Sequence, residues 1–218
     1  MKTTPLLPQL SDEDRFRQIA PQLEATGYVI LSSALPETLV NSLLLHFKSL
    51  EDDEFRLAGT GRATNYHVSQ GIRGDKIRWI DGHHPATHGY LAWVEALRLS
   101  LNRHLFLGLF DYECHYAYYP AGTFYRKHLD AFKGHTNRIL STVLYLNPIW
   151  EPEDGGALVL YDAKNDHLET ILPEYGKIVI FLSKVFPHEV LPVNKPRYSV
   201  AGWFRVNSNL GINLDPPR

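Results

Sequence analysis

The part of the chain that follows Tyr112 is a succession of short runs rich in Tyr, Val, Ile, Leu and Phe, separated by turns that contain Pro, Gly, Asn and Asp. Runs of this length and composition, bounded by turn residues, are typical of antiparallel β-strands. The predicted strands are Tyr112–Tyr119, Arg138–Leu146, Ala157–Tyr161, Leu168–Leu172, Lys177–Leu182, Glu189–Val193 and Tyr198–Val206, with shorter pieces near His128. So many strands at this spacing indicate a β-sandwich or jelly roll.

The part of the chain before Tyr112 is predicted to be mainly helical. Ser11 can cap a first helix, which Pro21 kinks or restarts and which Gly27 ends. The elements expected after it are a short buried strand at Tyr28–Leu31, a second helix opened by Pro36, and a long helix at Tyr90–Leu107.

These patterns predict one α+β domain, mainly β, that spans residues 1–218. Its core is a jelly roll, or double-stranded β-helix, over residues 112–206, and helices within residues 11–107 support one of its faces. A chain of this length can bury a sizeable core as one unit. The Gly-rich segment Leu57–Gly74 favours a mobile loop or a loosely held hairpin, of the kind that often acts as a lid.

Charge and cysteine content argue against several classes of protein. The formal net charge of -2 gives no electrostatic reason to expect a nucleic acid as partner. The single cysteine, Cys114, rules out an internal disulfide and suits a reducing compartment. The first ten residues contain no long apolar run, so neither a signal peptide nor a membrane span is predicted. We therefore expect a cytoplasmic, monomeric protein with no membrane association.

A histidine and a carboxylate stand two residues apart at His128 and Asp130. In an extended backbone such residues point to the same face, so both can hold one cation. We expect the third ligand to be His188, which comes after the predicted strand Lys177–Leu182 and a short turn. Two histidines and one carboxylate form the set used by non-haem Fe(II) oxygenases. Taken alone, the pair at His128 and Asp130 is more often structural, and it gains weight from an arginine further along the chain.

That arginine, Arg197, comes nine residues after His188, at the start of the predicted strand Tyr198–Val206. A guanidinium placed there can form a bidentate pair with a carboxylate inside the apolar jelly roll. A buried arginine without an anion would be costly, so an anionic ligand is the favoured interpretation. The alternative is that Arg197 pairs with a protein carboxylate or lies in solvent.

The pattern of His128, Asp130, His188 and Arg197 resembles the Fe(II)/2-oxoglutarate oxygenases. The surrounding sequence narrows the resemblance to prolyl hydroxylases of the hypoxia-inducible-factor type and their bacterial relatives. The similar stretches are Gly71–Ile80, Tyr119-Pro120, Tyr125–Asp130, Leu144–Asn147 with Trp150, Gly155-Gly156, Pro187–Val190 and Arg197–Trp203. The resemblance covers roughly residues 71–204, and it is far more specific than the metal-binding pattern alone.

By that resemblance, Arg197 binds the distal carboxylate of 2-oxoglutarate with help from the hydroxyl groups of Tyr145 and Tyr119. Either tyrosine could instead be an ordinary core residue. The stretch between Tyr119 and His128 is one residue shorter than in the animal enzymes, which leaves Tyr118 as an alternative to Tyr119. Ala201 stands where those enzymes carry a threonine near the co-substrate.

The resemblance also implies contacts with the substrate. Arg138, Tyr125 and Trp203 would lie around the iron and touch the substrate, although Trp203 could simply fill the mouth of the jelly roll. Arg73 and Asp75 would fix the base of the Gly-rich loop and so affect substrate entry.

The implied activity is the oxidative decarboxylation of 2-oxoglutarate coupled to hydroxylation of a prolyl residue, expected at C4, in a protein substrate. It requires Fe(II) and dioxygen, with ascorbate as an accessory reductant. The hypothesis for the substrate is an abundant cytosolic protein such as a translation factor.

Three alternatives to this activity remain open. The first two are oxidation of a free amino acid or other small molecule, and oxidation of a nucleic acid. The third is a non-catalytic, cupin-like module that binds a metal. A modest cluster of Arg56, Arg62, Arg73 and Arg78 is the only support for nucleic acid. Arg197 argues against the module, since such a module has no need of a carboxylate-binding group.

Overall fold

The structure is a computed structural model, and it describes residues 11–59, 71–130 and 137–207. Among these residues the α-helices are α1 (Asp12–Thr26), α2 (Glu37–Ser49) and α3 (Pro85–Leu105). Two short 3-10 helices, η1 (Asp52–Glu54) and η3 (Pro152–Asp154), lie in turns. Most of the predicted loop Leu57–Gly74 lies outside the described residues. No helix in the described ranges is long and apolar enough to cross a membrane.

The described strands form two antiparallel sheets. The larger sheet has the order β1-β9-β6-β11-β4-β3-β2 and the smaller sheet the order β5-β10-β7-β8. In the larger sheet the strands are β1 (Tyr28–Leu31), β9 (Ile178–Leu182), β6 (Arg138–Tyr145), β11 (Arg197–Arg205), β4 (Asp111–Tyr119), β3 (Lys76–Trp79) and β2 (Arg56–Leu57). In the smaller sheet they are β5 (Tyr125–His128), β10 (His188–Val190), β7 (Leu158–Tyr161) and β8 (His167–Ile171).

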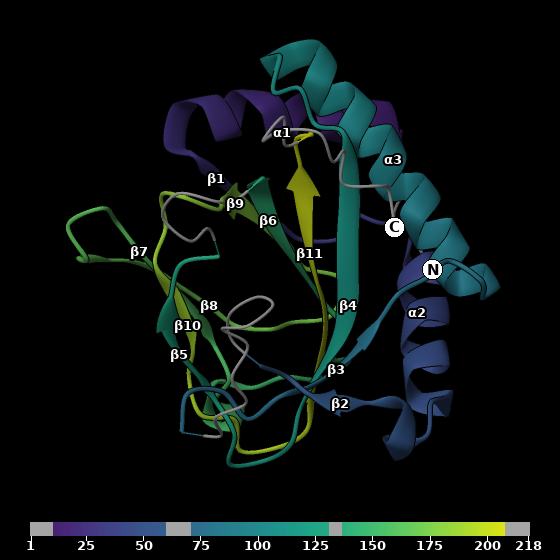
Figure 1. Cartoon of the computed structure of the whole chain (residues 1–218), viewed down its shortest axis with the longest axis vertical. Helices are drawn as coiled ribbons and strands as arrows, with labels where there is room; N and C mark the ends of the chain where they lie inside the picture. Colours follow the sequence, from purple (N-terminus) through teal and green to yellow (C-terminus); the bar gives the residue numbers. More distant parts are fainter. Residues whose placement is uncertain (1–10, 60–70, 131–136, 208–218) are drawn as a thin grey trace, which may run out of the picture.

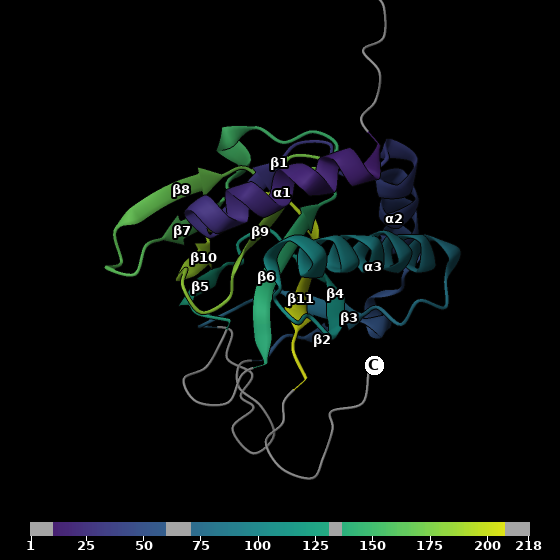
Figure 2. The same cartoon turned by 90° about the horizontal axis from the view of Figure 1, so that it is seen from above.

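The helices gather on one side of the larger sheet, and the smaller sheet lies on its other side (Figure 1). Figure 2 shows the same layers from above, with α1 and α3 running across the larger sheet. The predicted architecture, a jelly roll with helices supporting one face, is therefore confirmed.

Alternate side chains of β9 are buried in two different hydrophobic cores. Ile178 and Ile180 are buried against the helices, whereas Val179 and Phe181 are buried between the two sheets. Successive residues of a strand point to opposite faces, so a strand that is covered on both faces is apolar throughout. Fully burying a side chain of this kind contributes about 1.5–3 kcal/mol. The space between the sheets is thus lined mainly by buried apolar side chains around any polar side chain that projects into it.

The first helix has the predicted ends but not the predicted interruption. The Ser11 hydroxyl accepts a hydrogen bond from the Asp14 amide, and Gly27 ends the helix with a φ of 80°. We predicted that Pro21 either kinks or restarts the helix. The restart was wrong, because α1 is continuous from Asp12 to Thr26. Buried residues on both sides of the proline, among them Phe16 and Leu23, hold the helix against the core.

Other boundaries differ from the predictions by a few residues. The third helix begins at Pro85 instead of Tyr90, because the His84 side chain accepts a hydrogen bond from the Ala86 amide and caps it. The short strands β2 and β3 were not predicted. They extend one edge of the larger sheet, where β3 pairs with β4.

Candidate active site

Strand pairing in the smaller sheet brings His128 and His188 side by side. His128 is the last residue of β5, His188 is the first residue of β10, and the two are paired in the register of these strands. Their ring centroids are 4.2 Å apart. Two histidines that are distant in the sequence thus meet at the end of the sheet that faces β6 of the larger sheet.

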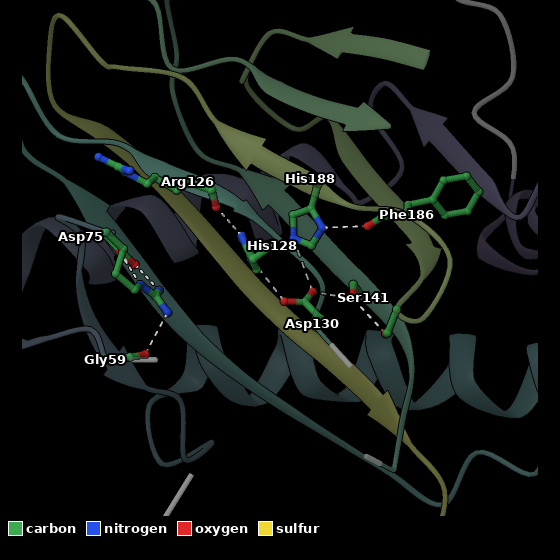
Figure 3. Close-up of polar contacts among 10 residues, drawn as sticks. Gly59, Asp75, Arg126, His128, Asp130, Ser141, Phe186 and His188 are labelled. Carbon is green, nitrogen blue, oxygen red and sulfur yellow. Dashed lines mark hydrogen bonds and ion pairs between the residues drawn. The ribbon is translucent and has the colours of Figure 1, made fainter. Parts of the chain in front are cut away.

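The Asp130 carboxylate completes a compact group of three side chains, which point toward one another in Figure 3. One carboxylate oxygen, Oδ1, lies 3.6 Å from His128 Nε2, and the other, Oδ2, lies 3.6 Å from His188 Nε2. One ligand atom from each residue lies within 4.8 Å of the other two. Among the described residues this is the group of His, Cys, Asp and Glu side chains that could hold a metal ion.

Backbone carbonyl groups orient both imidazole rings. Nδ1 of His128 lies 2.8 Å from the Arg126 carbonyl oxygen, and Nδ1 of His188 lies 3.1 Å from the Phe186 carbonyl oxygen. A carbonyl oxygen only accepts hydrogen bonds, so Nδ1 carries the proton in both rings and donates it. The lone pair of each ring is then on Nε2, the atom that faces Asp130. The rings are oriented as metal ligands are.

The charge states of these groups also suit a metal. Burial, together with the neighbouring His128 ring, lowers the pKa of His188 to about 4, so this imidazole is neutral at pH 7. Burial acts to raise the pKa of Asp130, but contacts with His188, His128 and Ser141 outweigh it and hold that pKa well below its usual value. Two imidazoles and one carboxylate form a donor set that fits Fe(II).

A second group of side chains, the carboxylate pocket, consists of Arg197, Tyr145 and Tyr119. Arg197 begins β11 and is 1% exposed, and its guanidinium carbon lies 4.9 Å from the Tyr119 ring centroid and 5.1 Å from that of Tyr145. The guanidinium donates to the Ser199 hydroxyl at 3.2 Å. It forms no ion pair with any carboxylate of the described residues. A buried cation is therefore left without an anion from this part of the chain.

Two polar atoms of the carboxylate pocket have no hydrogen-bond partner among the described residues. They are Nε of Arg197 and the hydroxyl oxygen of Tyr145, which is fully buried. Burial raises the pKa of Tyr145 to about 12 although Arg197 opposes the rise, so the hydroxyl keeps its proton and can donate it. Unpaired buried polar groups are costly, and a carboxylate of a bound molecule would satisfy both. The charge and the donors of this group thus suit the distal carboxylate of a 2-oxo dicarboxylic acid.

Gly156 allows the chain to approach the Arg197 side chain closely. Its φ is +65°, and a Cβ atom at this position would lie 3.0 Å from Arg197 Cδ and 2.5 Å from Val193 Cγ1. A side chain here would therefore displace the stem of Arg197.

The orientation of β4 distinguishes Tyr119 from its neighbour. Tyr119 is buried between the sheets beside Arg197, whereas Tyr118 lies on the helical side and stacks on Tyr198 with ring centroids 5.4 Å apart. Of the two alternatives, Tyr119 is the one that faces the carboxylate pocket.

Two of the predicted substrate contacts touch each other. The Arg138 guanidinium lies 3.6 Å from the centroid of the Trp203 ring, and it also donates to the buried Glu113 carboxylate at 2.8 and 3.0 Å. The indole nitrogen of Trp203 is buried without a partner among the described residues. Both residues lie at the end of the larger sheet, and their role toward a substrate stays a prediction.

The remaining predicted residues form a column that ends on a candidate metal ligand. The Tyr125 ring stacks on His128 with centroids 3.6 Å apart, and the guanidinium of Arg73 lies 4.2 Å from the centroid of the same tyrosine. Arg73 donates to both oxygens of the buried Asp75 and to the Gly59 carbonyl oxygen (Figure 3). Arg73 therefore links Asp75 and Gly59 to the Tyr125 ring and, through it, to His128.

The sequence prediction missed two residues beside the metal-binding group, Ser141 and Ser183. Both are buried, at 1% and 0% exposure, and the Ser141 hydroxyl donates to Asp130 Oδ2 at 2.6 Å. A usable signal was present, because each serine interrupts or ends an apolar run, in β6 and after β9.

Comparisons with known proteins agree with this geometry. The family model of the 2OG-Fe(II) oxygenase superfamily matches residues 114–205. The chain is 31% identical over 169 residues to Egl nine homolog 1 of Rattus norvegicus, an alignment that covers 70% of this chain and 49% of that protein. The chain thus spans about half the length of this curated relative.

Two solved structures are similar over nearly the whole chain. One is a Pseudomonas putida prolyl-4-hydroxylase, with 40% identity and a TM-score of 0.80 over 88% of this chain and 100% of that chain. The other is a prolyl hydroxylase from Trichoplax adhaerens in complex with a peptide of the hypoxia-inducible factor. It has 29% identity and a TM-score of 0.75 over 89% of this chain and 90% of that chain.

Proposed function

Because this chain belongs to the 2OG-Fe(II) oxygenase superfamily, we propose that it couples the oxidative decarboxylation of 2-oxoglutarate to the hydroxylation of a prolyl residue in a protein. The observation that carries this proposal is the buried guanidinium of Arg197, which has no carboxylate partner among the described residues and lies between the same two sheets as the metal-binding group. A structural metal site has no use for a buried cation of this kind. The similarity to a prolyl-4-hydroxylase favours C4 of the proline as the position of attack.

The residues divide into two binding groups with different tasks. His128, Asp130 and His188 hold Fe(II), and Arg197 with Tyr145 and Tyr119 binds the distal carboxylate of 2-oxoglutarate. When bound, the ferrous ion supplies the activation of dioxygen, and 2-oxoglutarate supplies two electrons as it becomes succinate and carbon dioxide. The reaction needs no general acid or base from the chain.

The protein's own contribution is orientation and the exclusion of water. Tyr145 is fully buried and Arg197 is 1% exposed, so the co-substrate exchanges its hydration shell for fixed donors. The carbonyl groups behind His128 and His188 set the ring orientation before the metal binds. A pre-formed site of this kind keeps the reacting groups in one geometry and limits side reactions.

The substrate side is proposed to include Arg138, Tyr125 and Trp203. Arg138 and Trp203 present a cation and an aromatic ring at the edge of the site, and Tyr125 covers the His128 ring. Arg73 and Asp75, which hold Gly59 in place, are proposed to affect how a substrate enters.

We also propose a biological setting for this activity. The substrate is a cytosolic protein, with a translation factor as the first candidate, and not a nucleic acid. The chain acts as a single, monomeric domain in the cytoplasm, and ascorbate keeps the iron reduced.

The test combines two measurements on the purified protein with Fe(II) and 2-oxoglutarate. Succinate formation is measured with and without proline-containing peptides, and each peptide is weighed for the gain of one oxygen atom. We expect peptide-dependent succinate and a gain that disappears when the proline is replaced. Fragmentation and comparison with authentic hydroxyprolines then separate C4 from C3. Absence of succinate under all conditions, with His128→Ala altering only stability, would instead indicate a metal-binding module.

A further inference from the structure

Two buried hydroxyl groups lie behind the metal-binding group and form the serine pair, defined as Ser141 on β6 and Ser183 just after β9. Their hydroxyl oxygens lie 2.9 Å apart, and Ser141 Oγ lies 2.6 Å from Asp130 Oδ2. Strand β6 otherwise presents Val143 and Tyr145 to the space between the sheets. A buried hydroxyl at this position has no packing advantage over an apolar side chain.

The donor in each of these two hydrogen bonds follows from the fact that each hydroxyl group has a single proton. An ionised carboxylate can only accept hydrogen bonds, so the single proton of Ser141 is directed to Asp130. The Ser141 oxygen can then only accept from Ser183, which makes Ser183 the donor in the second bond. The result is a chain of hydrogen bonds from Ser183 to Ser141 to the Asp130 carboxylate, in which each hydroxyl donates in one direction. Figure 3 shows the Ser141 side chain reaching Asp130.

The chain of hydrogen bonds joins the two sheets at the metal-binding group. Both histidines are oriented by carbonyl groups of their own segments, beside the smaller sheet. Asp130 comes just after β5 of that sheet, but the donor to its carboxylate comes from β6 of the larger sheet, which also carries Tyr145. Among the described residues, Asp130 Oδ1 accepts no comparable hydrogen bond.

From this arrangement we infer that the serine pair positions Asp130 for the metal: Ser141 occupies Oδ2, Oδ1 is left for the ion, and Ser183 fixes the proton of Ser141. Ser141 and Ser183 are positioning residues, since neither touches the reacting atoms. The inference rests on the proposed function, because it assumes that the three-residue group binds a metal.

The experiment measures the Kd of Mn²⁺, a redox-stable probe of the site, in the full chain. We expect Ser141→Ala to raise this Kd about 10- to 100-fold, the usual effect of removing a partner behind a metal ligand. Ser183→Ala should raise it less, about two- to tenfold, since it removes one neutral hydrogen bond. Ser141→Thr keeps the hydroxyl and should restore a Kd close to that of the wild type.

A variant that combines Ser141→Ala and Ser183→Ala tests whether the two serines act in series or independently on metal binding. Because Ser183 acts through Ser141, Ser183→Ala should have no further effect in the Ser141→Ala background. The matched control is Thr142→Ala, which removes a buried hydroxyl from the same strand but on the helical side, where it bonds to Tyr112. This control should lower stability and leave the Kd of Mn²⁺ within about twofold of the wild type.

The outcomes distinguish this inference from the proposed function. If the wild type binds no Mn²⁺, or if His188→Ala binds it equally well, the metal site itself is wrong. If His188→Ala loses Mn²⁺ while folded Ser141→Ala and Ser183→Ala bind it as the wild type does, only the serine pair is refuted. Ser183→Ala, which is one bond further from the carboxylate, keeps the test decisive should Ser141→Ala fail to fold.

Discussion

Replacing Tyr145 with phenylalanine should weaken the binding of 2-oxoglutarate without lowering the stability of the free protein. In the protein without 2-oxoglutarate, the fully buried Tyr145 hydroxyl has no hydrogen-bond partner among the described residues. Removing it with Tyr145→Phe therefore costs at most its weak electrostatic contact with Arg197, and the free energy of unfolding should stay unchanged or rise by up to about 1 kcal/mol. Binding should weaken, because the hydroxyl donates to the distal carboxylate of the co-substrate.

The loss of binding can be estimated from the type of hydrogen bond. A hydrogen bond to a charged group contributes about 1.5–3 kcal/mol. At about 1.4 kcal/mol for each factor of ten, the Kd of 2-oxoglutarate should rise roughly 10- to 150-fold. At a concentration of about 100 times the wild-type Kd, the ligand stabilises the wild type by about 2.7 kcal/mol and the variant by only about 0.3–1.4 kcal/mol. For a chain of this length the rise in Tm should fall from roughly 5–10 °C to below about 5 °C.

The assay is thermal unfolding with Mn²⁺ bound, across a titration of 2-oxoglutarate. The matched control is Tyr116→Phe, because the Tyr116 hydroxyl is equally buried but bonds to His46 Nδ1 at 3.0 Å. This variant should lose about 1 kcal/mol of stability and keep the wild-type Kd for 2-oxoglutarate. The reasoning is refuted if Tyr145→Phe destabilises the free protein as much as Tyr116→Phe does, or if it binds 2-oxoglutarate as the wild type does.

Two further predictions concern stability. Burial, reinforced by the charge of Arg73, lowers the pKa of His115 to about 4, below its ordinary value of 6.5, so the unfolded chain binds more protons between these two pH values. His115 should therefore cost stability as the pH falls from about 6.5 to about 4, by up to about 3 kcal/mol, and urea unfolding of His115→Gln should show a flatter pH profile. Gly156→Ala places a Cβ against Arg197 and Val193 at a positive φ, and it should lower stability by about 2–4 kcal/mol and weaken 2-oxoglutarate binding. Gly176→Ala also has a positive φ but meets no atom within 4 Å, so a loss there as large as at Gly156 would contradict the steric argument.

Much of the fold could be predicted because local rules and tertiary packing agree. Strands that are covered on both faces, such as β9, are apolar throughout, and turn residues bound them. The spacing of His128 and Asp130 placed both side chains on one face, and the structure brings them together with His188. Their role as ligands stays a prediction until metal binding is measured.

What could not be predicted depends on contacts between distant segments. Strand β3 alternates polar and apolar residues, but it has only four residues, which are partly exposed and lie near a sheet edge, so the alternation is too short to mark a strand by itself. The start of α3 depends on a histidine cap at His84, which is not among the preferred capping residues. Ser141 could be recognised as unusual in an apolar strand, but its partner Asp130 is reached only when the two sheets face each other.

The two sheets divide the site between them, and this division governs how the site forms. His128 and His188 belong to the smaller sheet, and Arg197 and Tyr145 belong to the larger sheet. The distance between metal and carboxylate pocket is therefore set by how the sheets pack, and not by any single strand. The bond from Ser141 to Asp130 ties the sheets together at the metal-binding group. A variant that loosens this bond should disturb metal binding first and 2-oxoglutarate binding second, because Arg197 keeps its place on the larger sheet.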